Sequence, residues 1–287
     1  MKKFIVTGGA GFIGSHICRA SHSKGIPVIS VDNLSAGYMT NIPKGVTNYA
    51  LDVSRDVREM ENLFQEFRPT MVFHQAASKK NICLENPVRD MEVNIQGAYN
   101  IAVLCKEYGV KMIHASTGSV YGEATGIQDE QHPVNPASFY GISKFAGERY
   151  ARLIADAVAL RYFHVYGPRQ EKDPDRGGVI AIWIDRIKKG LPVIVFGDGE
   201  QERCFTYVKD VVRANLMDLK PGVYNCANPQ RYTLNQLLQI LKGMYGEFPV
   251  EYRDPLPGDV RNFKVNSNKI GFPDWTPLEI GLNFTRI

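Results

Sequence analysis

The sequence lacks the features of secreted, membrane-spanning or metal-binding proteins. Its cysteines are odd in number and widely spaced, with no Cys-x-x-Cys or Cys/His metal spacing, and they are Cys18, Cys83, Cys105, Cys204 and Cys226. This usage predicts reduced packing residues in a cytoplasmic protein without a bound metal. No stretch approaches the ~18 apolar residues of a membrane helix. The start, Met1-Lys2-Lys3, resembles the beginning of a signal peptide, but the apolar run over residues 4–6 is too short to continue one.

A strong charge of either sign is also missing. The 34 Lys and Arg residues nearly balance the 30 Asp and Glu residues, and the net charge is +4. A nucleic-acid partner is therefore not predicted, whereas a small anionic ligand is compatible with the mild excess. With 287 residues, 44% of them hydrophobic, the chain is long enough for one large α/β domain or for a large and a small one.

Strand and helix patterns alternate through the first part of the chain. We expect strands at 3–7, 27–32, 46–51, 70–74, 110–115 and 157–163, and helices at 12–22, 57–67, 90–108 and 139–156. Such alternation predicts an α/β fold with a Rossmann-type doubly wound parallel sheet.

Beyond Gly167 proline, glycine and charged residues become more frequent. We expect helices near 178–189, 208–217 and 233–245 and a strand at 192–196. The predicted division is a dinucleotide-binding and catalytic domain over 1–167, followed by a smaller, partly discontinuous substrate-binding lobe over 168–287. The lobe would cover the carboxyl edge of the sheet, where ligands bind in such folds.

The turn after the first predicted strand reads Thr7-Gly8-Gly9-Ala10-Gly11-Phe12-Ile13-Gly14. Its glycines permit a tight turn and close backbone approach to a pyrophosphate at a helix N-terminus. Asp32 ends the second predicted strand, where a carboxylate binds the adenosine ribose and repels a 2′-phosphate. Asn33-Leu34-Ser35 adds no arginine for that phosphate. NAD is therefore predicted over NADP, the alternative being that Asp32 only caps a loop.

Lys144 lies four positions after Tyr140 on a predicted helix, so the two share one face. A phenol with a pKa of roughly 10 is a poor base at neutral pH. We expect the Lys144 ammonium, helped by an oxidised nicotinamide, to lower the pKa of Tyr140. A hydroxyl of Ser116-Thr117, after the fifth predicted strand, can orient the proton transfer. Together these residues indicate a general base that deprotonates an alcohol while a cofactor takes the hydride.

With these motifs the chain resembles extended short-chain dehydrogenases/reductases of the NAD-dependent epimerase/dehydratase family, and within it UDP-glucose 4-epimerases. The resemblance implies that Thr117, rather than Ser116, completes the catalytic set with Tyr140 and Lys144. It further implies cofactor contacts at Gly8, Gly11, Phe12, Ile13, Gly14, Asp32, Asn33, Leu34, Ser35, Asp52, Val53, Gln75, Ala76, Ala77, Lys79 (or its neighbour Lys80), Asn94, Tyr140, Lys144 and Tyr162. For Asn94 a structural hydrogen bond is the alternative, and the two roles can coexist.

The same resemblance implies that a nucleotide sugar is the substrate. Its expected contacts, besides Thr117 and Tyr140, are His164, Val179, Ile194, Phe196, Arg203, Asp259, Arg261 and Phe263. His164 stands where the family usually has an asparagine, and Cys204 where an aspartate is usual. An exposed charge is the alternative interpretation of Arg203 and Arg261. Phe263 falls at a position that selects sugar size.

Gly118-Ser119 distinguishes the reaction, because related 4,6-dehydratases carry an Asp-Glu pair there and this chain carries none. The implied activity is an NAD-dependent isomerase, a UDP-sugar 4-epimerase acting through a 4-keto intermediate. UDP-glucose and UDP-galactose are the first choice of substrate and UDP-hexuronates the second. A nucleotide-sugar decarboxylase or reductase remains an alternative, as does a non-catalytic NAD sensor. The resemblance also implies a homodimer through the helices at 90–108 and 139–156.

Overall fold

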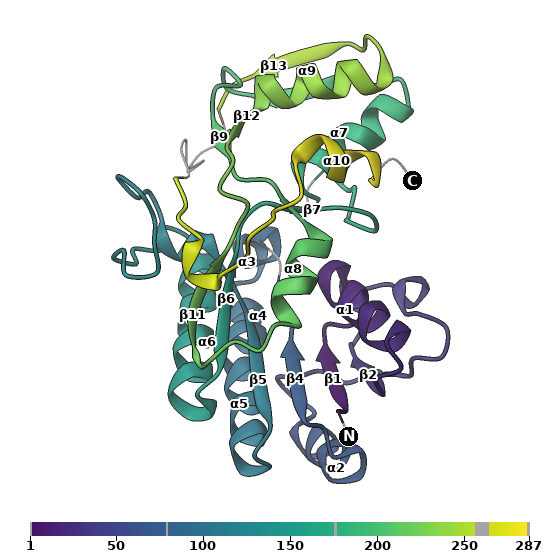
Figure 1. Cartoon of the computed structure of the whole chain (residues 1–287), viewed down its shortest axis with the longest axis vertical. Coiled ribbons are helices and arrows are strands. Elements are labelled where there is room, and N and C mark those ends of the chain that lie inside the picture. The colour runs from purple at the N-terminus through teal and green to yellow at the C-terminus, as the bar shows by residue number, and fades with distance from the viewer. Residues whose placement is uncertain (1, 79, 175–176, 256–263, 286–287) are drawn as a thin grey trace.

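A computed structural model describes residues 2–78, 80–174, 177–255 and 264–285. At its centre lies a parallel sheet in the order β11-β6-β5-β4-β1-β2-β3 (Figure 1). The strands are β1 (Phe4–Thr7), β2 (Val28–Val31), β3 (Asn48–Tyr49), β4 (Met71–His74), β5 (Lys111–Thr117), β6 (Val158–Tyr162) and β11 (Gly222–Cys226). After β3 the chain returns past β1 to form β4, so the strand order reverses between β1 and β4. This is the predicted doubly wound arrangement, and a ligand crevice is expected at the reversal.

Helices cover both faces of the sheet because strand side chains alternate between them. Phe4 and Phe73 pack toward α1 (Phe12–Ser23) and α8 (Val208–Asn215) in one apolar cluster. The opposite face, with Ile5 and Val72, packs against α2 (Val57–Phe67), α5 (Ala98–Glu107) and α6 (Phe139–Ala155). The sheet is thus covered on both faces, and we expect ligands at its strand ends.

The helix expected over 90–108 is interrupted. It consists of α4 (Pro87–Met91), a π-helical turn η2 (Glu92–Gly97) and α5. The π turn lies against α6, where a Cβ added to Gly147 would come within 2.3 Å of the Asn94 carbonyl oxygen. Only glycine permits this approach, which brings Asn94 next to the helix that carries Tyr140 and Lys144. Wide turns of this kind are frequent at functional sites.

A smaller lobe stands over the carboxyl ends of the strands (Figure 1). Its elements include α7 (Val179–Lys188), β8 (Val193–Phe196), α9 (Leu234–Tyr245), β13 (Val250–Arg253) and α10 (Leu278–Asn283). Trp183, Val195 and Leu237 belong to its own apolar core. Helix α9 begins with a capping box between Thr233 and Gln236, which satisfies backbone groups at its first turn.

Strand β11 was not anticipated from the sequence, although it completes the large sheet beside β6. Its segment is short and contains polar Asn225, which is fully buried. The Asn225 side-chain oxygen is satisfied there by a hydrogen bond from the Tyr121 hydroxyl at 2.8 Å. The chain therefore returns from the smaller lobe to the sheet after residue 207, forming α8 and β11. Within the described part of the chain, no helix is both long and apolar enough to cross a membrane.

Candidate active site

A cavity of about 500 Å³ lies along the carboxyl ends of the central strands. It extends from the loops after β2 and β3, over the glycine turn, to Tyr140 and Lys144 on α6. The predicted cofactor residues line it, with three exceptions. Leu34 is more than one-third exposed and Asn94 is buried behind the cavity wall, while Lys79 lies outside the described residues.

The glycine turn has the shape that a dinucleotide needs. Gly8 adopts a φ of +69°, and a Cβ there would lie 2.6 Å from the Ala76 backbone nitrogen. At Gly14 a Cβ would lie 2.1 Å from the Gly8 carbonyl oxygen, so α1 begins directly against the turn. The N-terminus of α1 therefore faces the cavity with no side chain in the way, as a pyrophosphate requires. The residues present fit NAD.

Asp32 is nearly fully buried at the end of β2. Its carboxylate accepts hydrogen bonds from the backbone nitrogens of Ala10, at 3.0 Å, and Leu34, at 2.8 Å. Burial raises the pKa of Asp32 despite these bonds, which act in the opposite direction. Asp32 thus caps the loop and lines the cavity at once, so the two interpretations of this residue are compatible.

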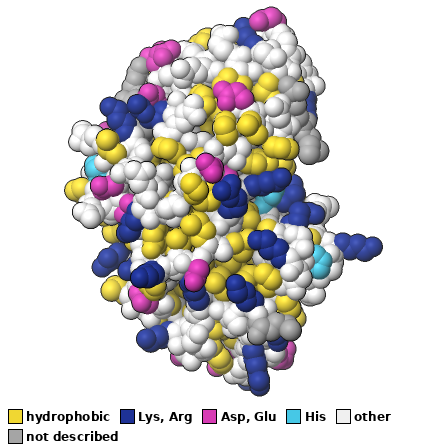
Figure 2. All heavy atoms as spheres, in the orientation of Figure 1, with side chains coloured by type: hydrophobic (Ala, Val, Ile, Leu, Met, Phe, Trp, Pro, Cys, Tyr) yellow, Lys and Arg dark blue, Asp and Glu magenta, His cyan; other side chains and the backbone are white. Residues whose placement is uncertain are grey.

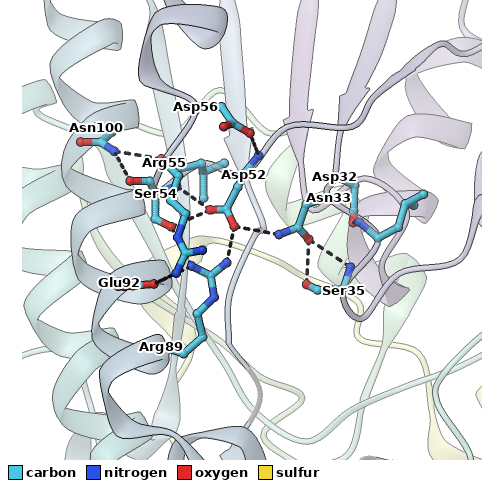
Figure 3. Close-up of polar contacts among 12 residues, drawn as sticks. Asp32, Asn33, Ser35, Asp52, Ser54, Arg55, Asp56, Arg89, Glu92 and Asn100 are labelled. Atoms are coloured by element: carbon cyan, nitrogen blue, oxygen red, sulfur yellow. Dashed lines mark hydrogen bonds and ion pairs between the residues drawn. The ribbon is translucent and has the colours of Figure 1, made fainter.

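Asp52 is the centre of a hydrogen-bonded network at the same end of the cavity as Asp32 (Figure 3). One carboxylate oxygen accepts from the Ser54 backbone nitrogen at 2.9 Å and from its hydroxyl at 2.6 Å. The other accepts from the Asn33 side-chain nitrogen at 2.9 Å and from the Arg89 guanidinium. Burial opposes ionisation, but the Ser54 bonds and the Arg89 ion pair outweigh it and lower the pKa of Asp52. Asp52 is therefore a charged anchor whose two oxygens are already engaged.

Tyr140 lies in the first turn of α6, which is capped by a hydrogen bond from the Gly141 backbone nitrogen to the Ser138 hydroxyl at 3.1 Å. A helix N-terminus favours negative charge, and hence a phenolate. Thr117, at the end of β5, hydrogen-bonds the Tyr140 oxygen and is itself nearly buried. Thr117 does not line the cavity, but it touches the residue that does. The structure thus brings the predicted catalytic pair of hydroxyls together.

The expected lowering of the Tyr140 pKa is wrong for the protein by itself. Burial raises the pKa of Tyr140 to about 12, nearby Cys83 and Asp90 add to the rise, and the Thr117 hydrogen bond only partly offsets it. The same burial lowers the pKa of Lys144 to about 8, against the attraction of Asp90 and Glu148. Desolvation is therefore the largest cause of the pKa shift at both groups. A lowered pKa of Tyr140 therefore depends on the second predicted cation, the oxidised nicotinamide.

Asn94 holds three segments together behind the reactive end. Its side-chain oxygen accepts from the Ser78 backbone nitrogen at 2.9 Å. Its side-chain nitrogen donates to Asp90 at 2.7 Å and to the Ser143 hydroxyl at 3.0 Å. These bonds join the loop after β4, helix α4 and helix α6. The structural role considered for Asn94 is thus present in the protein alone.

The neighbours of Thr117 are explained by packing. The Ser116 hydroxyl donates to Glu148 at 2.6 Å and points into the core, where Glu148 forms a buried ion pair with Arg161 at 2.7 Å. At Gly118 a Cβ would lie 2.3 Å from the Phe163 ring. An acidic side chain, as in the dehydratases, would collide with this ring unless it moved. The geometry therefore disfavours dehydration for a physical reason beyond the missing carboxylates.

Apart from Tyr140, the predicted sugar-nucleotide residues that the structure describes do not line the cavity. Val179 begins α7, Ile194 and Phe196 are half-buried on β8, and Arg203 is buried on β9 (Glu202–Arg203). His164 has a φ of 39° and its ring meets Phe205 edge-on at 6.2 Å. Asp259, Arg261 and Phe263 lie outside the described residues.

Several cavity residues were not predicted, including Tyr38, Asn41, Arg89, Arg169, Gln170 and Glu171. Arg169 has a φ of 66°, and its Nε donates to the Ser15 hydroxyl at 3.2 Å, beside the glycine turn. Burial, and then the positive charge of Arg19, lowers the pKa of Arg169. Its place after the Tyr166-Gly167-Pro168 stretch was the only available signal. No sequence signal pointed to Arg89, because its partners come from distant segments.

Basic side chains also gather outside the cavity. Figure 2 shows Lys and Arg atoms over α1 and α8 on one face of the molecule. Arg19 and Lys209 lie close enough to His16 to help burial lower its pKa to about 4. His16 contacts the Pro168 carbonyl oxygen through Nε2 at 2.9 Å, just before Arg169. Arg169 in the cavity and Arg19 and Lys209 near His16 thus place basic side chains around this part of the molecule, which suits a diphosphate.

Comparison with known proteins agrees with this geometry. The sequence model described as "NAD dependent epimerase/dehydratase family" matches residues 4–227. The chain belongs to this family. A putative UDP-glucose 4-epimerase of Methanocaldococcus jannaschii is 39% identical over 95% of this chain and 92% of its own length.

Solved structures are similar over nearly the whole chain. UDP-glucose 4-epimerase of Thermotoga maritima, solved with UDP-glucose, has a TM-score of 0.93 and 39% identity over 99% of this chain and 97% of its own. UDP-glucuronic acid 4-epimerase of Bacillus cereus, solved with UDP-glucuronic acid and NAD, has a TM-score of 0.88 and 26% identity over 99% of this chain and 98% of its own. These findings confirm the predicted family, the Rossmann-type fold, the NAD cofactor and an isomerase.

Proposed function

We propose that the protein is a UDP-sugar 4-epimerase that interconverts UDP-glucose and UDP-galactose. The observation that supports this most is the placement of Tyr140, in contact with Thr117, at the inner end of an NAD-sized cavity. The similarity to UDP-glucose 4-epimerases over nearly the full length supports the same substrate.

Each predicted residue has a task in this reaction. Tyr140, as phenolate, removes the proton of the C4 hydroxyl and later returns it to the same oxygen. Thr117 donates a hydrogen bond at that oxygen and so orients the transfer. Lys144, in ammonium form, lies one turn along α6 and would bind the nicotinamide ribose. NAD, when bound, supplies the reversible hydride chemistry at C4 of the sugar. Inversion requires the 4-keto sugar to present its other face before the hydride returns.

The adenosine end is assigned by the same reasoning. Asp32 and Asn33 would hold the ribose, and Asp52-Val53 the adenine, while the glycine turn and Arg169 would hold the pyrophosphate. The smaller lobe formed mainly by residues after 167 would bind the UDP group, through β8 and Arg203. Phe263, Asp259 and Arg261 complete this proposal from the sequence.

A hexuronate 4-epimerase is the second candidate. His164 is held in a left-handed backbone conformation in the chain between β6 and β7 (Val165–Tyr166), and an imidazole can donate a hydrogen bond to a carboxylate. The Bacillus cereus neighbour, solved with UDP-glucuronic acid, supports this possibility.

Incubation of the purified protein with UDP-glucose, without added NAD, tests the proposal. We expect UDP-galactose to appear, as resolved by proton NMR of the anomeric signals. Conversion of UDP-glucuronate alone would favour the second candidate, and release of carbon dioxide from it would indicate a decarboxylase. No conversion of any UDP-hexose or hexuronate, with NAD bound, would refute the proposed function.

A homodimer is proposed as well. Apolar side chains are exposed together on α5 and α6, where the Tyr99 and Tyr150 rings meet edge-on at 5.7 Å and Leu153 is 73% exposed. A second copy packing its own α5 and α6 there would bury them. Sedimentation should give twice the chain mass, and charge placed on this face by Leu153→Glu should give monomers. The cytoplasmic location stays a prediction, supported by five free, buried cysteines.

A further inference from the structure

Three cationic side chains line the described part of the cavity: Arg89, Lys144 and Arg169. Lys144 belongs to the reactive end and Arg169 to the glycine turn. Arg89 is therefore the cation at the adenosine end. It projects from α4, far in sequence from Asp32 and Asp52, and Figure 3 shows its guanidinium directed at the loop that carries Asp52.

The charge of Arg89 is already engaged. One guanidinium nitrogen pairs with the Asp52 carboxylate, and the other donates to Glu92 at 2.8 Å and to the Ser54 hydroxyl at 3.0 Å. Both carboxylates of the network therefore pair with Arg89. Glu92 in turn pairs with Arg55 at 2.7 Å. The network is complete within the protein and leaves little free positive charge for a ligand.

The network also reaches the ribose side of the cavity. The Asp52 oxygen that pairs with Arg89 accepts from the Asn33 side chain at 2.9 Å. Asn33 follows Asp32, so one carboxylate separates the Arg89 guanidinium from the loop where the adenosine 2′-hydroxyl is placed. In the proposed placement, a phosphate on that hydroxyl would lie beside Asn33, which shares an Asp52 oxygen with a cation of the kind that usually binds phosphate.

We propose that Arg89 is a latent phosphate-binding residue whose engagement by Asp52 and Glu92 contributes to selection of NAD over NADP. The inference rests on the proposed placement of adenosine at Asp32. In this arrangement Asp32 repels the 2′-phosphate directly. Asp52 and Glu92 act on Arg89, which they hold in ion pairs and away from the phosphate. Glu92 is a positioning residue, because it does not line the cavity.

Titration calorimetry of NAD-stripped protein with NADP and with NAD tests the proposal. Asp32→Asn serves as the background, because it removes the direct repulsion and keeps a similar shape. Adding Glu92→Gln should tighten NADP binding about fivefold, the size typical of one partly exposed ion pair, with NAD affinity changed less than twofold. The gain should shrink at high salt. It should also vanish when Arg89→Met is added, because Arg55, the other partner of Glu92, does not line the cavity.

Glu66→Gln, an exposed site on α2 with the same charge change, is the matched control and should leave NADP affinity unchanged. An unchanged NADP affinity in the Glu92→Gln protein would overturn the proposal, and so would a gain that persists without Arg89. NAD binding in the same titrations reports that each variant is folded. Because no sugar is present, a failure here is distinct from a failure of epimerase activity, which would leave nucleotide binding intact.

Discussion

Asp52 at the adenosine end of the cavity and the Tyr140–Lys144 pair at the reactive end are held in opposite ways. At the adenosine end, Asp52 has both carboxylate oxygens filled by protein donors, and its pKa is lowered. At the reactive end, burial raises the pKa of Tyr140 and lowers the pKa of Lys144, so both groups are held in unfavourable surroundings for their charged forms. Asp52 is thus kept charged by a closed hydrogen-bond network. At Tyr140 and Lys144, a bound ligand must compensate the desolvation before the charged forms are favoured.

Tyr140→Phe should have the largest effect, because it removes the base at the reactive end. We expect kcat to fall about 10³-fold, within the range of general-base catalysis, while NAD remains bound. Conversion of UDP-glucose, followed by NMR, measures kcat. The absorbance of released NAD measures how much cofactor was bound. Tyr150→Phe on the exposed side of the same helix is the matched control. Full activity in Tyr140→Phe would remove Tyr140 from the mechanism.

Stability should reveal the desolvated state of Lys144 through its pH dependence. Its pKa of about 8 in the folded protein lies below the ordinary value near 10.4. Between these values the unfolded chain binds a proton that the native state does not, so this site adds stability as pH rises.

Urea unfolding of wild type and Lys144→Met at pH 7 to 10 measures that contribution. As pH rises across this range, wild type should gain about 2–3 kcal/mol of unfolding free energy relative to Lys144→Met. Lys106→Met, exposed on α5, should show no such change. A difference between wild type and Lys144→Met that is constant with pH would contradict the desolvated lysine.

Gly118→Ala should damage the reactive end by overpacking. The added methyl would lie 2.3 Å from the Phe163 ring, and we expect a loss of about 1–3 kcal/mol in unfolding free energy with reduced kcat. Gly243→Ala, inside α9 with open space around it, should instead stabilise by about 0.5–1 kcal/mol. Equal stabilities of the two variants would show that the Phe163 contact does not constrain Gly118.

Ser54→Ala should have the smallest effect, because the adenosine end keeps its other bonds. The Ser54 hydroxyl donates to Asp52 and accepts from Arg89, and loss of these two bonds should weaken NAD binding by about 1 kcal/mol, or roughly fivefold. At saturating NAD, kcat should be unchanged. Calorimetry and steady-state kinetics separate the two quantities, and a fall in kcat would mean that the ends are coupled.

Local patterns predicted the fold well where they were strong. The glycine turn, Asp32 and the spacing of Tyr140 and Lys144 are contiguous signals, and they lie together on the cavity. Strand β11 was missed because its segment is short and polar at Asn225. Arg89 was missed because its role depends on pairing with Asp52 and Glu92, which only the fold brings near. The raised pKa of Tyr140 in the protein without cofactor was missed because burial is a property of packing, not of residue spacing.

Titration of Tyr140 with and without NAD tests the central contrast most directly. Phenolate absorbance near 295 nm, taken as wild type minus Tyr140→Phe, isolates this residue from the other tyrosines. We predict a pKa of about 12 in NAD-free protein and a fall of at least 2 units, about 3 kcal/mol, when oxidised NAD is bound. The same pKa of Tyr140 with and without NAD, or a value already near 7 without NAD, would contradict the desolvated reactive end.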